Sequence, residues 1–113
     1  MSAITTHILD TSLGQPAAGV SVELEYLSDG EWVGAGKGET NDDGRVKDLL
    51  KEDFKFQPGR YRIAFSVEDY FRKQSRDSFY PYVKIVFEVK DASAHYHVPL
   101  LLNPFGYSTY RGS

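Results

Sequence analysis

The fold class is decided by residues 19–27, which read Gly-Val-Ser-Val-Glu-Leu-Glu-Tyr-Leu. Apolar side chains occupy every second position and alternate with serine and glutamate, so an extended chain would have one apolar face and one polar face. This period of two predicts a half-buried β-strand. Residues 83–89, Val-Lys-Ile-Val-Phe-Glu-Val, repeat the pattern most clearly. We therefore expect strands packed against a shared core.

Shorter segments of the same kind extend the pattern along the whole chain. Further strands are expected at residues 4–9, 32–38, 60–65, 95–102 and 107–111, with turn residues between them. The exception is Ser66-Val67-Glu68-Asp69, which resembles a capping box. Helical spacing of apolar residues follows it, so we expect one helix over residues 67–76. Seven or eight short strands favour an all-β, antiparallel sandwich of two sheets.

Length and composition exclude several classes of protein. The 113 residues suit one domain, expected to span residues 1–113. A net charge of −3 argues against a nucleic-acid partner, and the absence of cysteine excludes disulfides, thiol catalysis and cysteine-ligated metals. No apolar run approaches the roughly 20 residues that cross a bilayer, and no signal-like segment opens the chain. We expect a soluble, cytoplasmic protein without a membrane partner.

Three histidines, at positions 7, 95 and 97, are the candidates for proton chemistry at neutral pH. His95 and His97 would project from the same face of a strand, with their Cα atoms roughly 7 Å apart. Three interpretations stay open. The side chains decorate a solvated face, they form a zinc site together with His7, or they act without metal as general base and acid.

Two other segments carry polar groups of interest. Arg45 follows the turn Asp42-Asp43-Gly44, where its guanidinium is either solvated or available to a carbonyl or a developing oxyanion. The chain closes on Tyr110-Arg111-Gly112-Ser113, which physical reasoning alone does not distinguish from an ordinary chain end. The chain contains neither a G-x-S-x-G elbow nor a phosphate-binding loop of the G-x-x-x-x-G-K-[ST] type.

Three segments together resemble a known family. They are Thr6–Asp10 (THILD), Asp43–Arg45 (DGR), and His95–Leu101 (HYHVPLL), which leads to the terminal YRGS. They are similar to those of the 5-hydroxyisourate hydrolases, the transthyretin-related enzymes of urate degradation. The terminal YRGS is the most specific element, because it separates the enzymes from hormone-binding transthyretins. The resemblance implies a transthyretin-like sandwich of about eight strands with one short helix. It also implies a homotetramer, a dimer of dimers, with active sites where two dimers meet.

The resemblance also implies roles for individual residues. The catalytic set would be His7, Arg45, His97 and Ser113. The substrate-binding set would be His7, Arg45, Tyr110, Arg111 and Gly112. The implied reaction opens the ring of 5-hydroxyisourate at a cyclic amide, giving 2-oxo-4-hydroxy-4-carboxy-5-ureidoimidazoline, without metal or organic cofactor.

This chemistry suits the residue types. His97 or His7 would act as general base, Arg45 or Arg111 would stabilise the oxyanion, and Ser113 would orient His97. His95 receives no role. The alternatives are a non-enzymatic, transthyretin-like carrier of a small ligand and a three-histidine zinc protein.

Overall fold

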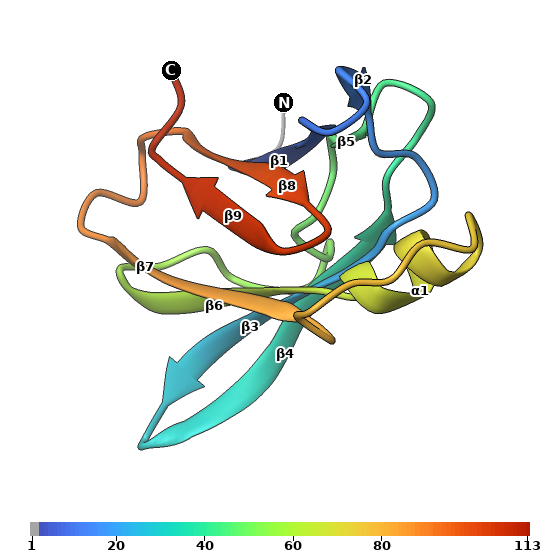
Figure 1. Cartoon of the computed structure of the whole chain (residues 1–113). Coiled ribbons are helices and arrows are strands. Elements are labelled where there is room, and N and C mark those ends of the chain that lie inside the picture. The colour runs from blue at the N-terminus through green and yellow to red at the C-terminus, as the bar shows by residue number, and fades with distance from the viewer. Residues whose placement is uncertain (1–2) are drawn as a thin grey trace.

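The computed structural model describes residues 3–113 as nine strands and one helix (Figure 1). Positions 1 and 2, with which the expected domain begins, lie outside the described residues. One sheet contains β1 (Ile4–Asp10), β2 (Gln15–Pro16), β5 (Arg45–Val46), β8 (Tyr96–Asn103) and β9 (Gly106–Thr109). The other contains β3 (Ser21–Ser28), β4 (Glu31–Glu39), β6 (Gly59–Phe65) and β7 (Val83–Val89). The helix, α1, spans Val67–Arg72.

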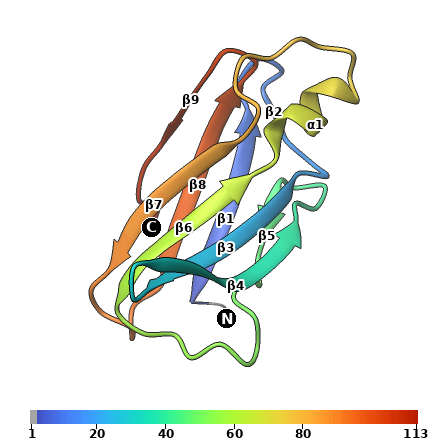
Figure 2. The same cartoon turned by 90° about the horizontal axis from the view of Figure 1, so that it is seen from below.

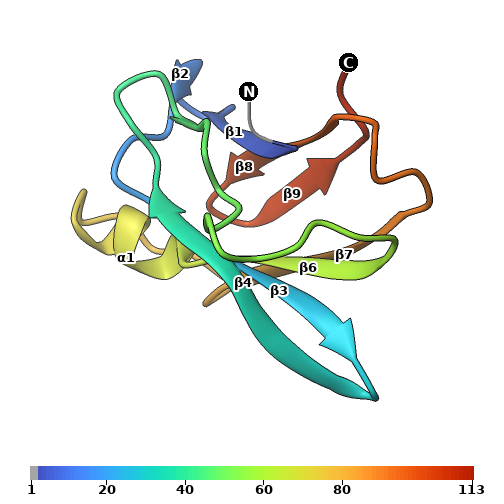
Figure 3. The ribbon, with the colours of Figure 1, turned by 180° about the vertical axis from the view of Figure 1, so that it is seen from behind.

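The two sheets face each other and enclose the core (Figures 1 and 3). The first has the strand order β2-β1-β8-β9 with β5 paired to β1, and the second has the order β4-β3-β6-β7. Alternating positions on the facing strands are fully buried, among them Ile8, Leu100, Leu24, Ile63 and Phe65. The all-β sandwich with one short helix is therefore confirmed. Within residues 3–113, no helix is long and apolar enough to cross a membrane.

One strand pair departs from the expected antiparallel arrangement. β1 and β8 run parallel, in an unbroken register from Ile4 opposite Tyr96 to Asp10 opposite Leu102. The other strand pairs in the described part of the chain are antiparallel. The alternation of apolar and polar residues indicates which face of a strand is buried, but not the direction of the neighbouring strand. The sequence pattern therefore could not predict that β1 and β8 run parallel.

The helix is shorter than predicted and ends at Arg72 instead of residue 76. The reason is Ser75, which adopts a left-handed conformation with φ of 55°. The backbone N–H of Ser75 donates to Arg72 O at 2.9 Å, and that of Arg76 donates to Phe71 O at 3.1 Å. These two bonds form a Schellman closure that terminates the helix. At the other end, Ser66 makes no side-chain capping bond, so the expected capping box does not form.

α1 lies near the end of β1 that leads to β2 (Figure 2). A buried carboxylate, that of Asp10, joins the two elements. Asp10 is fully buried and accepts hydrogen bonds from the backbone and hydroxyl of Ser12, from the Tyr70 hydroxyl at 2.8 Å and from the Arg76 guanidinium. Burial opposes ionisation of Asp10, but the bonds from Ser12, Arg76 and Tyr70 outweigh it and hold its pKa below the ordinary value. The helix end is therefore attached to the sheet by an ionised group.

We predict that Asp10→Asn lowers the free energy of unfolding by roughly 2–4 kcal/mol, because Arg76 loses its buried partner. The pKa of Asp10 is lower in the folded chain than in the unfolded chain. Its contribution is therefore present above the unfolded pKa and is lost as the pH falls through the folded value. Urea unfolding of both proteins at several pH values measures the difference, which should shrink in acid.

The matched control is Asp69→Asn, since Asp69 pairs with Arg72 on the exposed face of α1. Exposed pairs contribute roughly 0–1 kcal/mol, so this variant should unfold almost like the parent protein. Equal effects of the two substitutions would contradict the account.

Candidate active site

The outer face of the first sheet gathers the polar residues singled out above. Along β1 the core takes every second residue from Ile4, so Thr5 and His7 lie half-buried on the outer face. The parallel register places Thr5 opposite His97 of β8. On the other side of β1, the short strand β5 places Arg45 opposite His7. Three strands from distant parts of the chain thus bring two histidines and an arginine to one surface.

Arg45 is held by a closed loop that precedes it. The side-chain Oδ1 of Asn41 accepts from the backbone N–H groups of Asp43 at 2.9 Å and Arg45 at 3.0 Å. Gly44 adopts φ of 73°, and its carbonyl oxygen accepts from the backbone N–H of Ile8 at 2.7 Å. A Cβ at Gly44 would lie 2.5 Å from Ile8 O, so glycine is required there. The loop therefore fixes Arg45 against β1.

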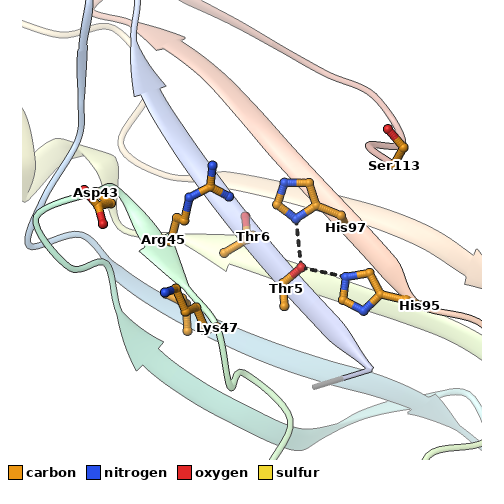
Figure 4. A pocket seen from close by; sticks show the side chains of 9 residues that line it. Thr5, Thr6, Asp43, Arg45, Lys47, His95, His97 and Ser113 are labelled. Carbon is orange, nitrogen blue, oxygen red and sulfur yellow. Dashed lines mark hydrogen bonds between the residues drawn. The ribbon is translucent and has the colours of Figure 1, made fainter. Parts of the chain in front are cut away.

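A polar cleft of about 420 Å³ opens between β5 and β8 (Figure 4). It is lined by Thr5, Thr6, Asp43, Arg45, Val46, Lys47, His95, His97 and Ser113. Figure 4 shows the guanidinium of Arg45 next to the imidazole of His97, with Lys47 on the same side as Arg45. The cleft therefore combines a histidine base with two cations.

Burial and neighbouring charge keep the two catalytic candidates neutral. The pKa of His97 lies below its ordinary value of 6.5, first because of burial, then because of the positive charge of Arg45 and of the charge that His7 and His95 carry when protonated. The pKa of His7 is also lowered, by burial and by Arg45, against an opposing contribution from Asp43. His7 does not line the cleft, but it is close enough for its protonated form to disfavour protonation of His97. Both rings therefore retain a free lone pair at neutral pH.

The four terminal residues lie around His97, which lines two pockets. Gly112 forms a bridge to His97, with its N–H donating to His97 O at 2.8 Å. A Cβ at Gly112 would lie 2.5 Å from His97 Cδ2, so only glycine allows this approach, which brings Ser113 to the cleft. Arg111 instead stacks on the Tyr96 ring at 4.5 Å. Tyr110 and Arg111 line a second pocket beside β7, which shares His97 with the cleft but does not include Arg45.

Sequence reasoning missed three residues of this site: Thr5, Asn41 and Lys47. The Oγ1 atom of Thr5 lies 2.8 Å from His97 Nδ1 and 3.1 Å from His95 Nε2. For Asn41, the sequence N-D-D-G was the available signal, since asparagine commonly accepts from backbone N–H groups in such turns. Within residues 3–113, no three His, Asp or Glu side chains are arranged to hold a metal ion, so the geometry does not favour the three-histidine zinc alternative.

Residues 4–112 match the HIUase/Transthyretin family. The chain belongs to this family. Among its relatives, the 5-hydroxyisourate hydrolase of Mus musculus is 42% identical over 114 aligned residues, covering 99% of this chain and 96% of that protein. The recognition drawn from the three sequence segments is thereby confirmed.

Solved structures of the family include both an enzyme and a hormone-binding protein. The 5-hydroxyisourate hydrolase of Klebsiella pneumoniae is 37% identical, with a TM-score of 0.83 over 99% of this chain and 100% of that one. Sea bream transthyretin, solved in complex with thyroxine, is 30% identical, with a TM-score of 0.90 over 97% and 94% of the two chains. The backbone fits both structures well, so side chains must distinguish the two functions.

We predict that Arg45→Gln raises the pKa of His97 and of His7, because it removes a positive charge that acts on both imidazoles. Titration of the histidine ring signals by NMR measures both values. Arg60→Gln, an exposed arginine on the other sheet, is the matched control and should leave them unchanged. Unaltered titration of both histidines in the Arg45 variant would contradict the described electrostatics.

Proposed function

We propose that this chain hydrolyses 5-hydroxyisourate, opening the ring at a cyclic amide to give 2-oxo-4-hydroxy-4-carboxy-5-ureidoimidazoline, a step of urate degradation. The observation that carries the proposal is one cleft in which a neutral histidine, His97, lies beside a guanidinium, Arg45. The mouse and Klebsiella pneumoniae relatives, both 5-hydroxyisourate hydrolases, support the same substrate.

The proposed reaction needs one base and one cation. Water attacks the amide carbonyl and transfers a proton to His97, while negative charge develops on the carbonyl oxygen. Arg45 stabilises that oxyanion from the wall of the cleft. The carbon–nitrogen bond then breaks, and the imidazolium returns its proton to the departing nitrogen. Side chains supply each of these steps, so we propose no metal or organic cofactor.

The remaining residues of the site are proposed to bind the substrate and to orient the reacting groups. His7 lies beside Arg45 across the β1–β5 pair and is proposed to assist His97 or to bind the substrate. Gly112 brings Ser113 to the cleft, where its hydroxyl can orient the His97 ring or the attacking water. The substrate is planar and rich in carbonyl and N–H groups, which suit the forked donors of arginine.

Tyr110 and Arg111 are proposed to reach substrate in an assembly. They line a pocket outside the cleft, next to β7 and β9, which are the last strands of their sheets. Free sheet edges pair readily with another chain. Exposed aromatic side chains lie near these edges, namely Phe79, Tyr80, Tyr82, Phe105 and Tyr107. These features support a homotetramer built as a dimer of dimers, with sites where dimers meet.

A non-enzymatic carrier of an aromatic ligand is the second candidate. The high TM-score to sea bream transthyretin in complex with thyroxine favours it. The side chains of the cleft favour hydrolysis, because a base and two cations have no evident use in holding an aromatic hormone. Thyroxine binding measured by calorimetry, without any effect on 5-hydroxyisourate, would support the carrier.

We predict that the protein accelerates the decay of 5-hydroxyisourate generated from urate by uricase, followed by absorbance. His97→Asn should lower kcat by roughly 100- to 10,000-fold, because the amide cannot accept the proton from water. Arg60→Gln serves as the control and should retain full turnover. Decay no faster than the spontaneous reaction, or full turnover by a folded His97→Asn protein, would overturn the proposal.

A further inference from the structure

The hydroxyl of Thr5 lies between two histidines, His97 of β8 and His95, which directly precedes β8. Its Oγ1 atom lies 2.8 Å from His97 Nδ1 and 3.1 Å from His95 Nε2, as the dashed lines in Figure 4 show. A hydroxyl carries one hydrogen and can accept from other donors. The two imidazoles therefore cannot both receive its proton. If the hydroxyl donates to one ring, it is free to accept from the other.

The direction of these bonds follows from the surroundings of His97. Hydrogen bonding to the backbone of Thr5 raises the pKa of this ring, opposing the effects of burial and neighbouring charge. A backbone carbonyl can only accept, so its donor is a ring N–H, and Nδ1 is the ring nitrogen of His97 that faces Thr5. We therefore infer that Nδ1 carries the hydrogen. Nδ1 then also donates to Thr5 Oγ1, and the hydroxyl hydrogen is left to point at His95 Nε2. In Figure 4 the second nitrogen of His97 points away from Thr5, toward Arg45.

We propose that Thr5 and His95 are positioning residues that hold His97 in the tautomer with a protonated Nδ1, so that its bare Nε2 faces the cleft. The opposite tautomer would present an N–H to the attacking water and could not accept its proton. The effect on turnover rests on the proposed hydrolysis, whereas the tautomer is a property of the resting protein. The arrangement gives His95 a role that the sequence left open.

The fold restricts the side chain of Thr5 and the backbone of His95. Thr5 is half-buried and stands opposite His97 in the parallel ladder, and a β-branched side chain has few rotamers. The backbone carbonyl of His95 accepts from Arg111 Nη2 at 3.3 Å, which links it to the terminal segment. Other ionisable groups also lie around His97. Arg45 and His7 lower its pKa, and Asp43 and Lys47 line the same cleft.

The test compares Thr5→Val with Thr5→Ser in protein labelled with ¹⁵N at histidine. Long-range ¹H–¹⁵N spectra above the titration range report which ring nitrogen carries hydrogen. In the parent protein and in Thr5→Ser, we expect His97 with protonated Nδ1. In Thr5→Val, we expect a shift toward protonated Nε2. For Thr5→Val, kcat should fall by about tenfold with little change in KM, because a smaller fraction of molecules has the tautomer with a bare Nε2.

Two further variants keep the outcome clear. Thr11→Val makes the same change farther along the chain, where the hydroxyl donates to Leu102 O, and should alter neither tautomer nor kcat. His95→Phe removes the nitrogen that accepts from the Thr5 hydroxyl, so it should also shift His97 toward protonated Nε2 and lower kcat. This variant tests the proposal even if Thr5→Val does not fold.

A Thr5→Val or His95→Phe protein that keeps protonated Nδ1 and the parent kcat would overturn the proposal. A shifted tautomer in a protein whose parent shows no hydrolysis would support the positioning role and contradict only the proposed function.

Discussion

The parallel pairing of β1 with β8 is the constraint on which the site depends. It joins segments from near the two ends of the chain in one register, so that Thr5 faces His97 across the ladder. The same strand β1 receives β5 on its other edge, which places Arg45 opposite His7. A slip of one residue would turn the outer face of β1 into the core and disperse these groups. The bridge of Gly112 to His97 then brings the last residue to the cleft.

The electrostatic surroundings set the protonation state of His97. Burial and the nearby guanidinium of Arg45 favour the neutral form of His97, which is the form that can accept a proton. In the proposed reaction the same guanidinium would stabilise the oxyanion, so one cation would act in both the resting and the reacting state. The backbone is shared with transthyretin, and the function therefore depends on a few side chains on the outer face of one sheet.

Much of this architecture follows from the sequence, because the alternation of apolar and polar residues indicates which side chains of a strand are buried. The strands at 19–27 and 83–89 and the shared face of His95 and His97 were predictable on that basis. The end of the helix depends on an unusual conformation of Ser75 that no glycine signals. Thr5 was missed because a threonine in a strand is ordinarily a strand former, and its two imidazole partners lie more than 85 positions away.

The central claim is that substrate binds on the outer face, between β5 and β8, and not beside β7. Titration of ¹⁵N-labelled protein with urate, a planar oxopurine close to the substrate, tests it most directly by mapping backbone shift changes. The account predicts the largest changes at Thr5, Arg45 and Lys47, which line the cleft. Changes confined to Ile85, Val86 and Phe87, which line the apolar pocket beside β7 and not the cleft, would contradict it.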